Sequence, residues 1–205
     1  MLFSFFKPKA GRLYLFAYAI TGLTLLTLLS GSYKHYEPFQ SSVTEIDIEK
    51  FAGEWFIISN IPYFAEKNKV GSKTNYKLHN NRFDDIFISQ EGSFDAPIDI
   101  LKGSAKSTNP SNTQWQSTFY WLIRFNFEVI YINEDYSIML LAHKSRDYGW
   151  VMSRTSTVPN RTIINAMKVF THNGYDISKF RLVPQHPKQI GLMHKNINEI
   201  YELDL

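Results

Sequence analysis

Residues 114–121 alternate between two kinds of side chain, with Trp115, Phe119 and Trp121 on one side of the backbone and mainly glutamine and threonine on the other. A period of two is typical of a β-strand with one apolar face. The same alternation predicts eight short strands and a later ninth, at 54–60, 71–78, 82–89, 98–107, 114–122, 126–133, 136–143, 148–155 and 180–184. Short turns separate the first eight, so they form a meander that either packs as a sandwich or closes into a barrel.

One stretch of the chain follows the period of a helix instead. Pro159-Asn160 gives a start signal and Gly174 a stop signal. Between them Ile163, Met167 and Phe170 fall four and three residues apart, which places them on one face of a helix. Because only one face is apolar, we expect this helix to pack on the outside of the sheet.

The N-terminal part has a different pattern. Residues 13–30 contain no charged side chain, and Lys7, Lys9 and Arg12 precede them. This pattern indicates an export signal or an uncleaved signal-anchor helix. As a helix the stretch is roughly 27 Å long, close to the ~30 Å hydrocarbon core of a bilayer. The positive flank stays in the cytoplasm and the rest of the chain crosses the membrane. Small residues at 30–32 permit cleavage, and both cleavage and retention remain open.

These patterns divide the chain into four parts. They are a signal peptide or signal-anchor transmembrane helix at 1–30, a spacer at 31–46, a β domain at 47–187 and a polar tail at 188–205. The protein is therefore expected to be exported and to face the periplasm. If the leader is not cleaved, residues 13–30 hold it at the membrane.

Composition excludes several classes of function. The chain has no cysteine, which excludes disulfides, cysteine-ligated metals and a thiol nucleophile. Of 22 basic residues three lie before residue 13, so 19 basic and 19 acidic residues remain in the rest, which lacks the basic face of a nucleic-acid-binding protein. There is no glycine-rich phosphate loop, and the six histidines lack metal-ligand spacing. We therefore expect no enzyme activity, catalytic residue, metal, cofactor or nucleic-acid partner.

Three short motifs occur in a fixed order along the β domain: Gly53-Glu54-Trp55, Glu134-Asp135-Tyr136 and Ser153-Arg154-Thr155. Together with 147–155 and 174–180, they resemble the signature regions of the lipocalin family, especially the bacterial outer-membrane lipocalins and the apolipoprotein D branch. The resemblance implies an all-β fold, an eight-stranded antiparallel up-and-down barrel with one C-terminal helix packed outside. Members of the bacterial branch are often anchored through an acylated cysteine. This chain has none, so a retained N-terminal helix would replace that anchor.

The motif residues have physical roles at the closed end of such a barrel. Trp55 covers that end with a large flat ring, and Arg154 lies across the indole in a cation–π contact. Gly53 allows a tight turn below the barrel, and Asp135 accepts backbone amides in its own turn, next to Tyr136. We therefore expect these five residues to be structural rather than catalytic.

The alternation of barrel strands also predicts which side chains point inward. The candidate ligand-cavity residues are Ile57, Thr74, Tyr76, Trp115, Phe119, Trp121, Val129, Tyr131, Trp150 and Met152. A largely apolar cavity with a few hydroxyls suits an acyl chain, since each buried methylene contributes about 0.8 kcal/mol. The alternative is that these aromatic side chains simply fill the interior.

The resemblance implies binding and transport of a small hydrophobic ligand, such as a fatty acid or a lysophospholipid, in the bacterial cell envelope. Two alternatives remain. One is a non-enzymatic envelope interaction module with a filled barrel, held at the membrane by the N-terminal helix. The other is an isomerase built on the same fold, which would need titratable side chains that converge at the barrel mouth.

Overall fold

The computed structural model describes residues 36–79 and 82–201, and the chain divides into two units, Met1–Glu37 and Pro38–Leu205. All of the helices and strands named below belong to the second unit. The apolar stretch at 13–30, with its predicted export or membrane role, lies outside the described residues. Among the described residues, no helix is long and apolar enough to span a bilayer.

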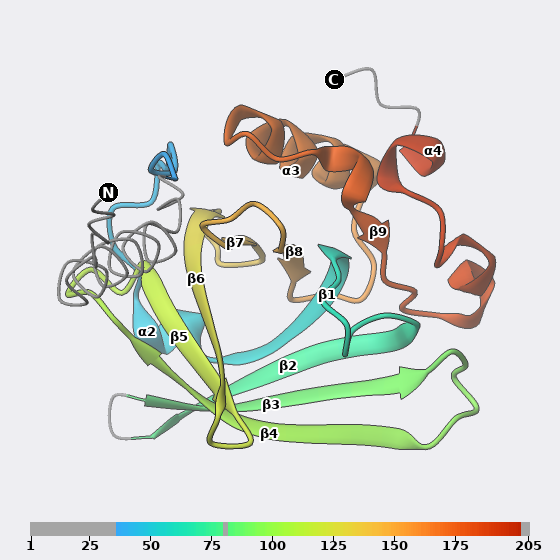
Figure 1. Ribbon diagram of the computed structural model, residues 1–205, viewed down its shortest axis with the longest axis horizontal. Helices are drawn as coiled ribbons and strands as arrows, with labels where there is room; N and C mark the ends of the chain where they lie inside the picture. Colours follow the sequence, from blue (N-terminus) through green and yellow to red (C-terminus); the bar gives the residue numbers. More distant parts are fainter. Residues whose placement is uncertain (1–35, 80–81, 202–205) are drawn as a thin grey trace, which may run out of the picture. The chain divides into compact units, whose positions relative to one another are not determined.

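Eight antiparallel strands, each paired with the next along the chain, form a closed barrel (Figure 1). They are β1 (Gly53–Ile61), β2 (Lys69–His79), β3 (Arg82–Glu91), β4 (Ile98–Ser107), β5 (Gln114–Phe119), β6 (Ile123–Ile132), β7 (Ile138–Ala142) and β8 (Gly149–Ser153). The barrel closes because β1 pairs with β8 on one edge and with β2 on the other. Alternation alone left a sandwich and a barrel open, and this pairing confirms the barrel.

The closure between β1 and β2 is partial. The first four residues of β1 pair with β2, whereas Ser59 and Asn60 pair with β9 (Arg181–Leu182). Beyond β9, the side-chain amide of Gln185 donates to a carbonyl oxygen of β1 at 2.8 Å and to one of β2 at 3.1 Å. The C-terminal segment therefore completes the barrel wall where the two strands separate.

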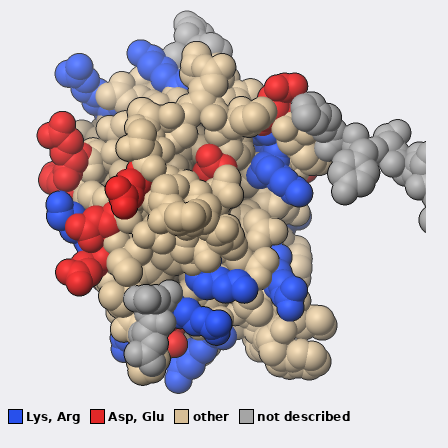
Figure 2. Space-filling model, turned by 90° about the vertical axis from the view of Figure 1, so that its left-hand side faces the viewer, with Lys and Arg blue, Asp and Glu red and all other residues tan. Residues whose placement is uncertain are grey.

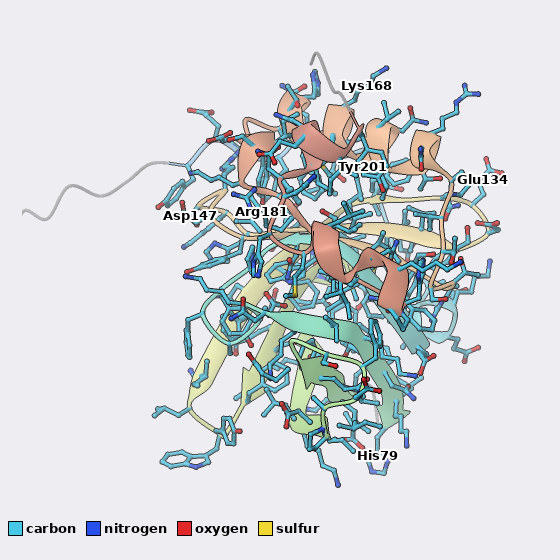
Figure 3. All side chains as sticks on the ribbon, turned by 90° about the vertical axis from the view of Figure 1, so that its right-hand side faces the viewer. His79, Glu134, Asp147, Lys168, Arg181 and Tyr201 are labelled. Carbon is cyan, nitrogen blue, oxygen red and sulfur yellow. The ribbon has the colours of Figure 1, made fainter. Side chains whose placement is uncertain are left out.

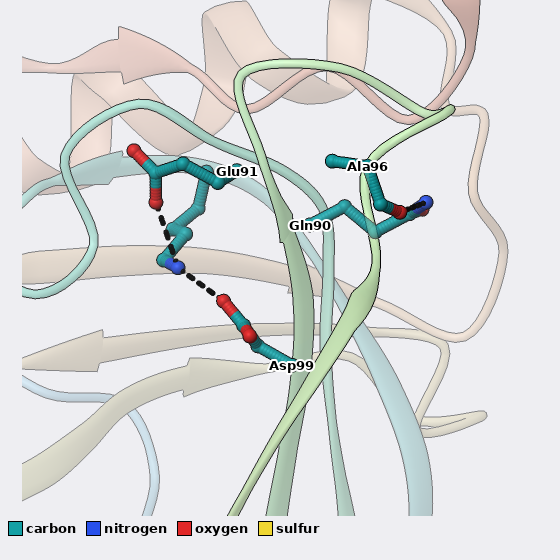
Figure 4. Close-up of polar contacts among 5 residues, drawn as sticks. Gln90, Glu91, Ala96 and Asp99 are labelled. Atoms are coloured by element: carbon teal, nitrogen blue, oxygen red, sulfur yellow. Dashed lines mark hydrogen bonds and ion pairs between the residues drawn. The ribbon is translucent and has the colours of Figure 1, made fainter.

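A lysine joins β2, β3 and β4 at the open end of the barrel (Figure 4). Lys69 Nζ lies 2.8 Å from a carboxylate oxygen of Glu91 and 2.7 Å from one of Asp99. Nearby, Gln90 Nε2 donates to the carbonyl oxygen of Ala96 at 2.8 Å and shapes the β3–β4 connection. Exposed ion pairs contribute at most about 1 kcal/mol each, so this contact orders the strand ends more than it stabilises the fold.

A helix covers the outside of the barrel, as predicted. α3 (Asn160–His172) buries Ile163, Met167 and Phe170 against outward-facing side chains of β1, β6, β7 and β8. Figure 1 shows α3 together with η1 (Ile177–Lys179) and α4 (Ile197–Tyr201) on one side of the barrel. In Figure 3, Lys168 of α3 points away from the strands, and this is the polar face that the helical pattern predicts.

The segments on either side of the barrel pack more closely than their sequence indicates. Before the barrel, Ile46 is buried within the spacer 31–46, and α2 (Ile48–Phe51) forms where the sequence pattern predicts no helix. After the barrel, the short helix η2 (Pro187–Leu192) covers the start of the polar tail predicted at 188–205, and α4 lies farther along the same tail. Ile197 is fully buried in the outer core, so α4 anchors this part of the tail to the barrel.

The surface carries a mixed distribution of charge. Figure 2 shows that Lys and Arg side chains and Asp and Glu side chains both occur on one face, with wide uncharged areas between them. This mixture agrees with the equal numbers of basic and acidic residues in the sequence after the N-terminal segment.

Candidate functional site

Trp55 and Arg154 lie together at the closed end of the barrel. Trp55 is fully buried, and its Nε1 donates to the carbonyl oxygen of Phe51 at 2.9 Å. The guanidinium carbon of Arg154 lies 3.7 Å from the centroid of the indole. The guanidinium donates to the backbone carbonyls of Lys50, Phe51, Ala52, Glu54 and Tyr136. A single cation therefore covers the indole and satisfies the carbonyl groups of the chain that crosses the closed end.

The other predicted signature residues surround this pair. Gly53 has a φ of +99°, a conformation that favours glycine, and a Cβ on it would lie 3.3 Å from a guanidinium nitrogen of Arg154, which would have to shift slightly. Asp135 accepts the backbone N–H of Ser137 at 3.1 Å, and the hydroxyl of Tyr136 accepts that of Asp47 at 3.0 Å. These contacts hold the turns at the closed end in place.

Above the closed end, the barrel encloses a cavity of about 70 Å³. Six of the predicted cavity residues line it: Ile57, Thr74, Tyr76, Phe119, Trp150 and Met152. The other lining residues are Tyr63, Glu66, Asp85, Phe87, Ser117, Phe125, Phe127 and Leu141. Ligand pockets commonly have volumes of about 300–1,000 Å³, so the cavity in this conformation accepts only a small molecule.

The prediction that Trp121 faces the cavity is wrong. Its side chain is 86% exposed, because the strand predicted at 114–122 ends at Phe119 and reverses direction immediately afterwards. Tyr120 and Trp121 have φ values of +48° and +54°, and the N–H of Leu122 donates to the carbonyl oxygen of Phe119 at 3.2 Å. A two-residue turn of this kind favours asparagine and glycine, and neither occurs here to signal it.

Three further cavity predictions need correction. Tyr131 faces the outer core and lies against α3, because the β6–β7 pairing shifts register between Val129 and Tyr131 and so reverses the alternation. Val129 is buried in the inner core and does not line the cavity. Trp115 is buried too, but it stacks on Phe51 with ring centroids 5.0 Å apart and fills the closed end instead.

Replacement of Trp121 by asparagine tests its position in the turn. Asparagine adopts positive φ more readily than tryptophan, and the exposed indole contributes little packing. We therefore expect the free energy of unfolding of Trp121→Asn, measured by urea denaturation, to be no lower than that of the parent protein. A loss of more than about 1 kcal/mol would place the indole inside the fold instead.

The connection between β1 and β2 supplies two cavity residues that the sequence pattern does not reveal. Glu66 accepts the indole N–H of Trp150 at 2.9 Å, and the ring of Tyr63 lies 4.8 Å from that of Phe125 on β6. Since these partners belong to β8 and β6, the connection at 62–68 folds across the open end of the barrel. Burial raises the pKa of Glu66 from its ordinary value of 4.5 to about 7.

A second carboxyl group lies deeper in the barrel. Asp85 accepts hydrogen bonds from the hydroxyls of Thr74 at 2.5 Å and Ser117 at 2.8 Å, and burial raises its pKa. Its neighbour Asp84 is exposed, as expected for adjacent residues of one strand. The alternation of Phe83, Asp85 and Phe87 along β3 was the signal for this position.

A closed eight-stranded barrel with a small, mainly apolar cavity is an architecture whose interior is filled by side chains or holds one small ligand. Residues 46–185 match the family model of the lipocalin-like domain, and the chain belongs to that family. Lipocalins in general bind or transport small hydrophobic ligands rather than catalyse reactions.

Relatives and solved structures agree with this assignment. The chain is 28% identical over 153 residues to temperature-induced lipocalin-1 of Arabidopsis thaliana. The aligned region covers 70% of this chain and 81% of that protein. It is 24% identical over 144 residues to the outer membrane lipoprotein Blc of Escherichia coli, and the aligned region covers 70% of this chain and 81% of that protein. The fold is similar to that of insecticyanin from the tobacco hornworm Manduca sexta, with a TM-score of 0.60, 17% identity and coverage of 76% and 89%.

Proposed function

We propose that this protein binds a small hydrophobic ligand inside the barrel and carries it in the bacterial cell envelope. The observation that supports this most is the apolar lining of the cavity, to which seven strands and the β1–β2 connection contribute aromatic or aliphatic side chains above a closed floor. The apolar stretch at 13–30 and the similarity to an outer membrane lipoprotein support an exported, periplasm-facing protein held at the membrane.

The candidate ligands are a fatty acid, a lysophospholipid or a molecule of similar character. An acyl chain is larger than a cavity of about 70 Å³ allows. It therefore enters only if the connection at 62–68 moves away from the open end, where Tyr63 and Glu66 now contact β6 and β8. Movements of such connections on ligand binding are common in proteins.

Native mass spectrometry and a fluorescent acyl probe test this proposal on the full-length chain. We expect co-purified lipid or saturable probe binding, and we expect Leu141→Phe to abolish it because the added ring occupies the cavity. Ile100→Phe is the control, since Ile100 lies exposed on the outer face of β4. If neither lipid nor probe binds at micromolar concentrations, or if Leu141→Phe binds as the parent does, binding within the barrel is refuted.

The small cavity also favours a second candidate, a non-enzymatic envelope interaction module with a nearly filled barrel. Its contact surface would be the open end, where Phe64 and Trp121 are 77% and 86% exposed. Exposed large apolar side chains are typical of interaction surfaces when they form a contiguous patch. A protein partner lost from Trp121→Asn, together with no ligand binding, would favour this candidate over a carrier.

A further inference from the structure

Two carboxyl groups face the cavity, and no cation accompanies them. The cavity lining contains no lysine, arginine or histidine. Neither Glu66 nor Asp85 takes part in any ion pair found within residues 36–79 and 82–201. Their hydrogen-bond donors are neutral. Glu66 accepts from the indole of Trp150, the backbone N–H of Tyr63 and the side chain of Asn60, and Asp85 accepts from the hydroxyls of Thr74 and Ser117.

Both carboxyl groups belong to one electrostatic site. Burial raises the pKa of Tyr63 at the open end and of Tyr76 deeper in the barrel, and both carboxyl groups, acting through space, raise these two pKa values further. A ligand in a cavity of about 70 Å³ therefore experiences both acids at once. Screening by water is weak at such a buried site, so the charge of the ligand matters more there than on the surface.

An unpaired buried carboxylate is costly. Removing the charge from water costs several kcal/mol unless a partner of opposite charge compensates it. Side chains of similar volume without a charge would fill the same space at no such cost. A cationic ligand explains the arrangement, because it would supply the partner that the protein itself lacks.

We propose that the cavity binds a small organic cation, a protonated amine on a short apolar body, whose ammonium group lies beside Glu66 and Asp85. This inference rests on the proposed function and specifies the polar group of its ligand. Tyr63, Phe119 and Phe125 line the same space, and aromatic rings attract an ammonium group that lies over their faces. A free fatty acid is disfavoured, because its carboxylate would meet two acidic groups and no donor of positive charge.

A metal ion is a poorer occupant of the site. Metal ions such as Ca²⁺ take six to eight oxygen ligands, whereas the part of the chain that the structure describes contains no cluster of three or more acidic or histidine side chains that could hold one. The apolar side chains that make up most of the lining would leave such an ion without ligands. An amine with a hydrocarbon body satisfies both the carboxyl groups and the apolar walls.

Three ligands with the same six-carbon body separate charge from hydrophobicity: n-hexylamine, 1-hexanol and hexanoate. Their affinities for the full-length chain are measured by isothermal titration calorimetry at pH 8, where the amine is protonated and Glu66 is ionised. We expect hexylamine to bind about tenfold or more tightly than hexanol, since hydrogen bonds between charged groups are stronger than neutral ones. Hexanoate should bind more weakly than hexanol.

The variants Glu66→Gln and Asp85→Asn assign this preference to the two acids. Each keeps the shape of the side chain and should weaken hexylamine binding about tenfold while leaving hexanol binding unchanged. Asp84→Asn is the matched control, because Asp84 is the exposed neighbour of Asp85 and should leave all three affinities as in the parent.

The outcomes distinguish this inference from the proposed function. If hexanol binds as tightly as hexylamine, or if both cavity variants bind hexylamine like the parent, the cation site is refuted and a neutral hydrophobic ligand remains. If none of the three ligands binds and the acyl probe also fails, both proposals fall. Should a variant not fold, the comparison of the three ligands on the parent protein still decides the question.

Discussion

Replacement of Trp55 by alanine is expected to lower the free energy of unfolding by about 3–5 kcal/mol, the range typical of large buried aromatic truncations. The indole is fully buried, donates to the carbonyl oxygen of Phe51 and lies under the guanidinium of Arg154. Its loss leaves a cavity at the closed end and removes the cation–π contact. Urea denaturation of the parent and the variant measures the difference.

Trp121→Ala is the control for this experiment. It removes the same side chain from a site that is 86% exposed, so the free energy of unfolding should change by about 0.5 kcal/mol or less. Equal stability of Trp55→Ala and the parent protein would contradict the position of Trp55 at the barrel floor.

The stability of the protein is expected to fall as the pH rises from about 5 to 8, and Glu66 is the main cause. Its pKa is raised from 4.5 to about 7 by burial, so between these values the folded protein binds more protons than the unfolded chain. Below pH 4.5 the ionisation of Glu66 does not change the free energy of unfolding. As the pH rises above this value the free energy of unfolding falls, and the loss reaches about 3 kcal/mol once the pH exceeds the folded-state pKa of about 7.

Glu66→Gln should remove most of this dependence, because the amide cannot ionise but still accepts the hydrogen bond of Trp150. Thermal or urea unfolding at several pH values measures the slope. Burial raises the pKa of Asp85 as well, so a slope of the same sign should remain in this variant. Exposed Glu134 provides the control, and Glu134→Gln should keep the slope of the parent. A slope unchanged in Glu66→Gln would contradict the burial of this carboxyl group.

The sequence predicts regular strands well because successive side chains of a strand alternate between the two faces of the sheet, which leaves a period of two in the sequence. The strand expected at 98–107 is β4, with the same bounds, and the helix expected after Pro159 is α3. Alternation fails where the backbone departs from regular pairing. The register shift in β6 turns Tyr131 outward, and the turn after Phe119 exposes Trp121.

The two acids of the candidate site differ in how far the sequence reveals them. Asp85 lies on β3 between two buried or half-buried phenylalanines, so its inward direction follows from the same period of two. Glu66 lies in a connection without any period. Its hydrogen-bond partners are Trp150 on β8, far away in the sequence, and Asn60 near the end of β1. Only the folded barrel brings these side chains together around Glu66.

The partial closure between β1 and β2 has a consequence for truncated forms of the protein. Removal of the residues after Phe180 would take away β9 and the amide of Gln185, and so leave unpaired backbone groups along the second half of β1. A free strand edge invites pairing with the same edge of another molecule. The segment after Phe180 thus shields this strand edge from self-association, and it does so beside the connection at 62–68, next to the mouth through which a ligand would pass.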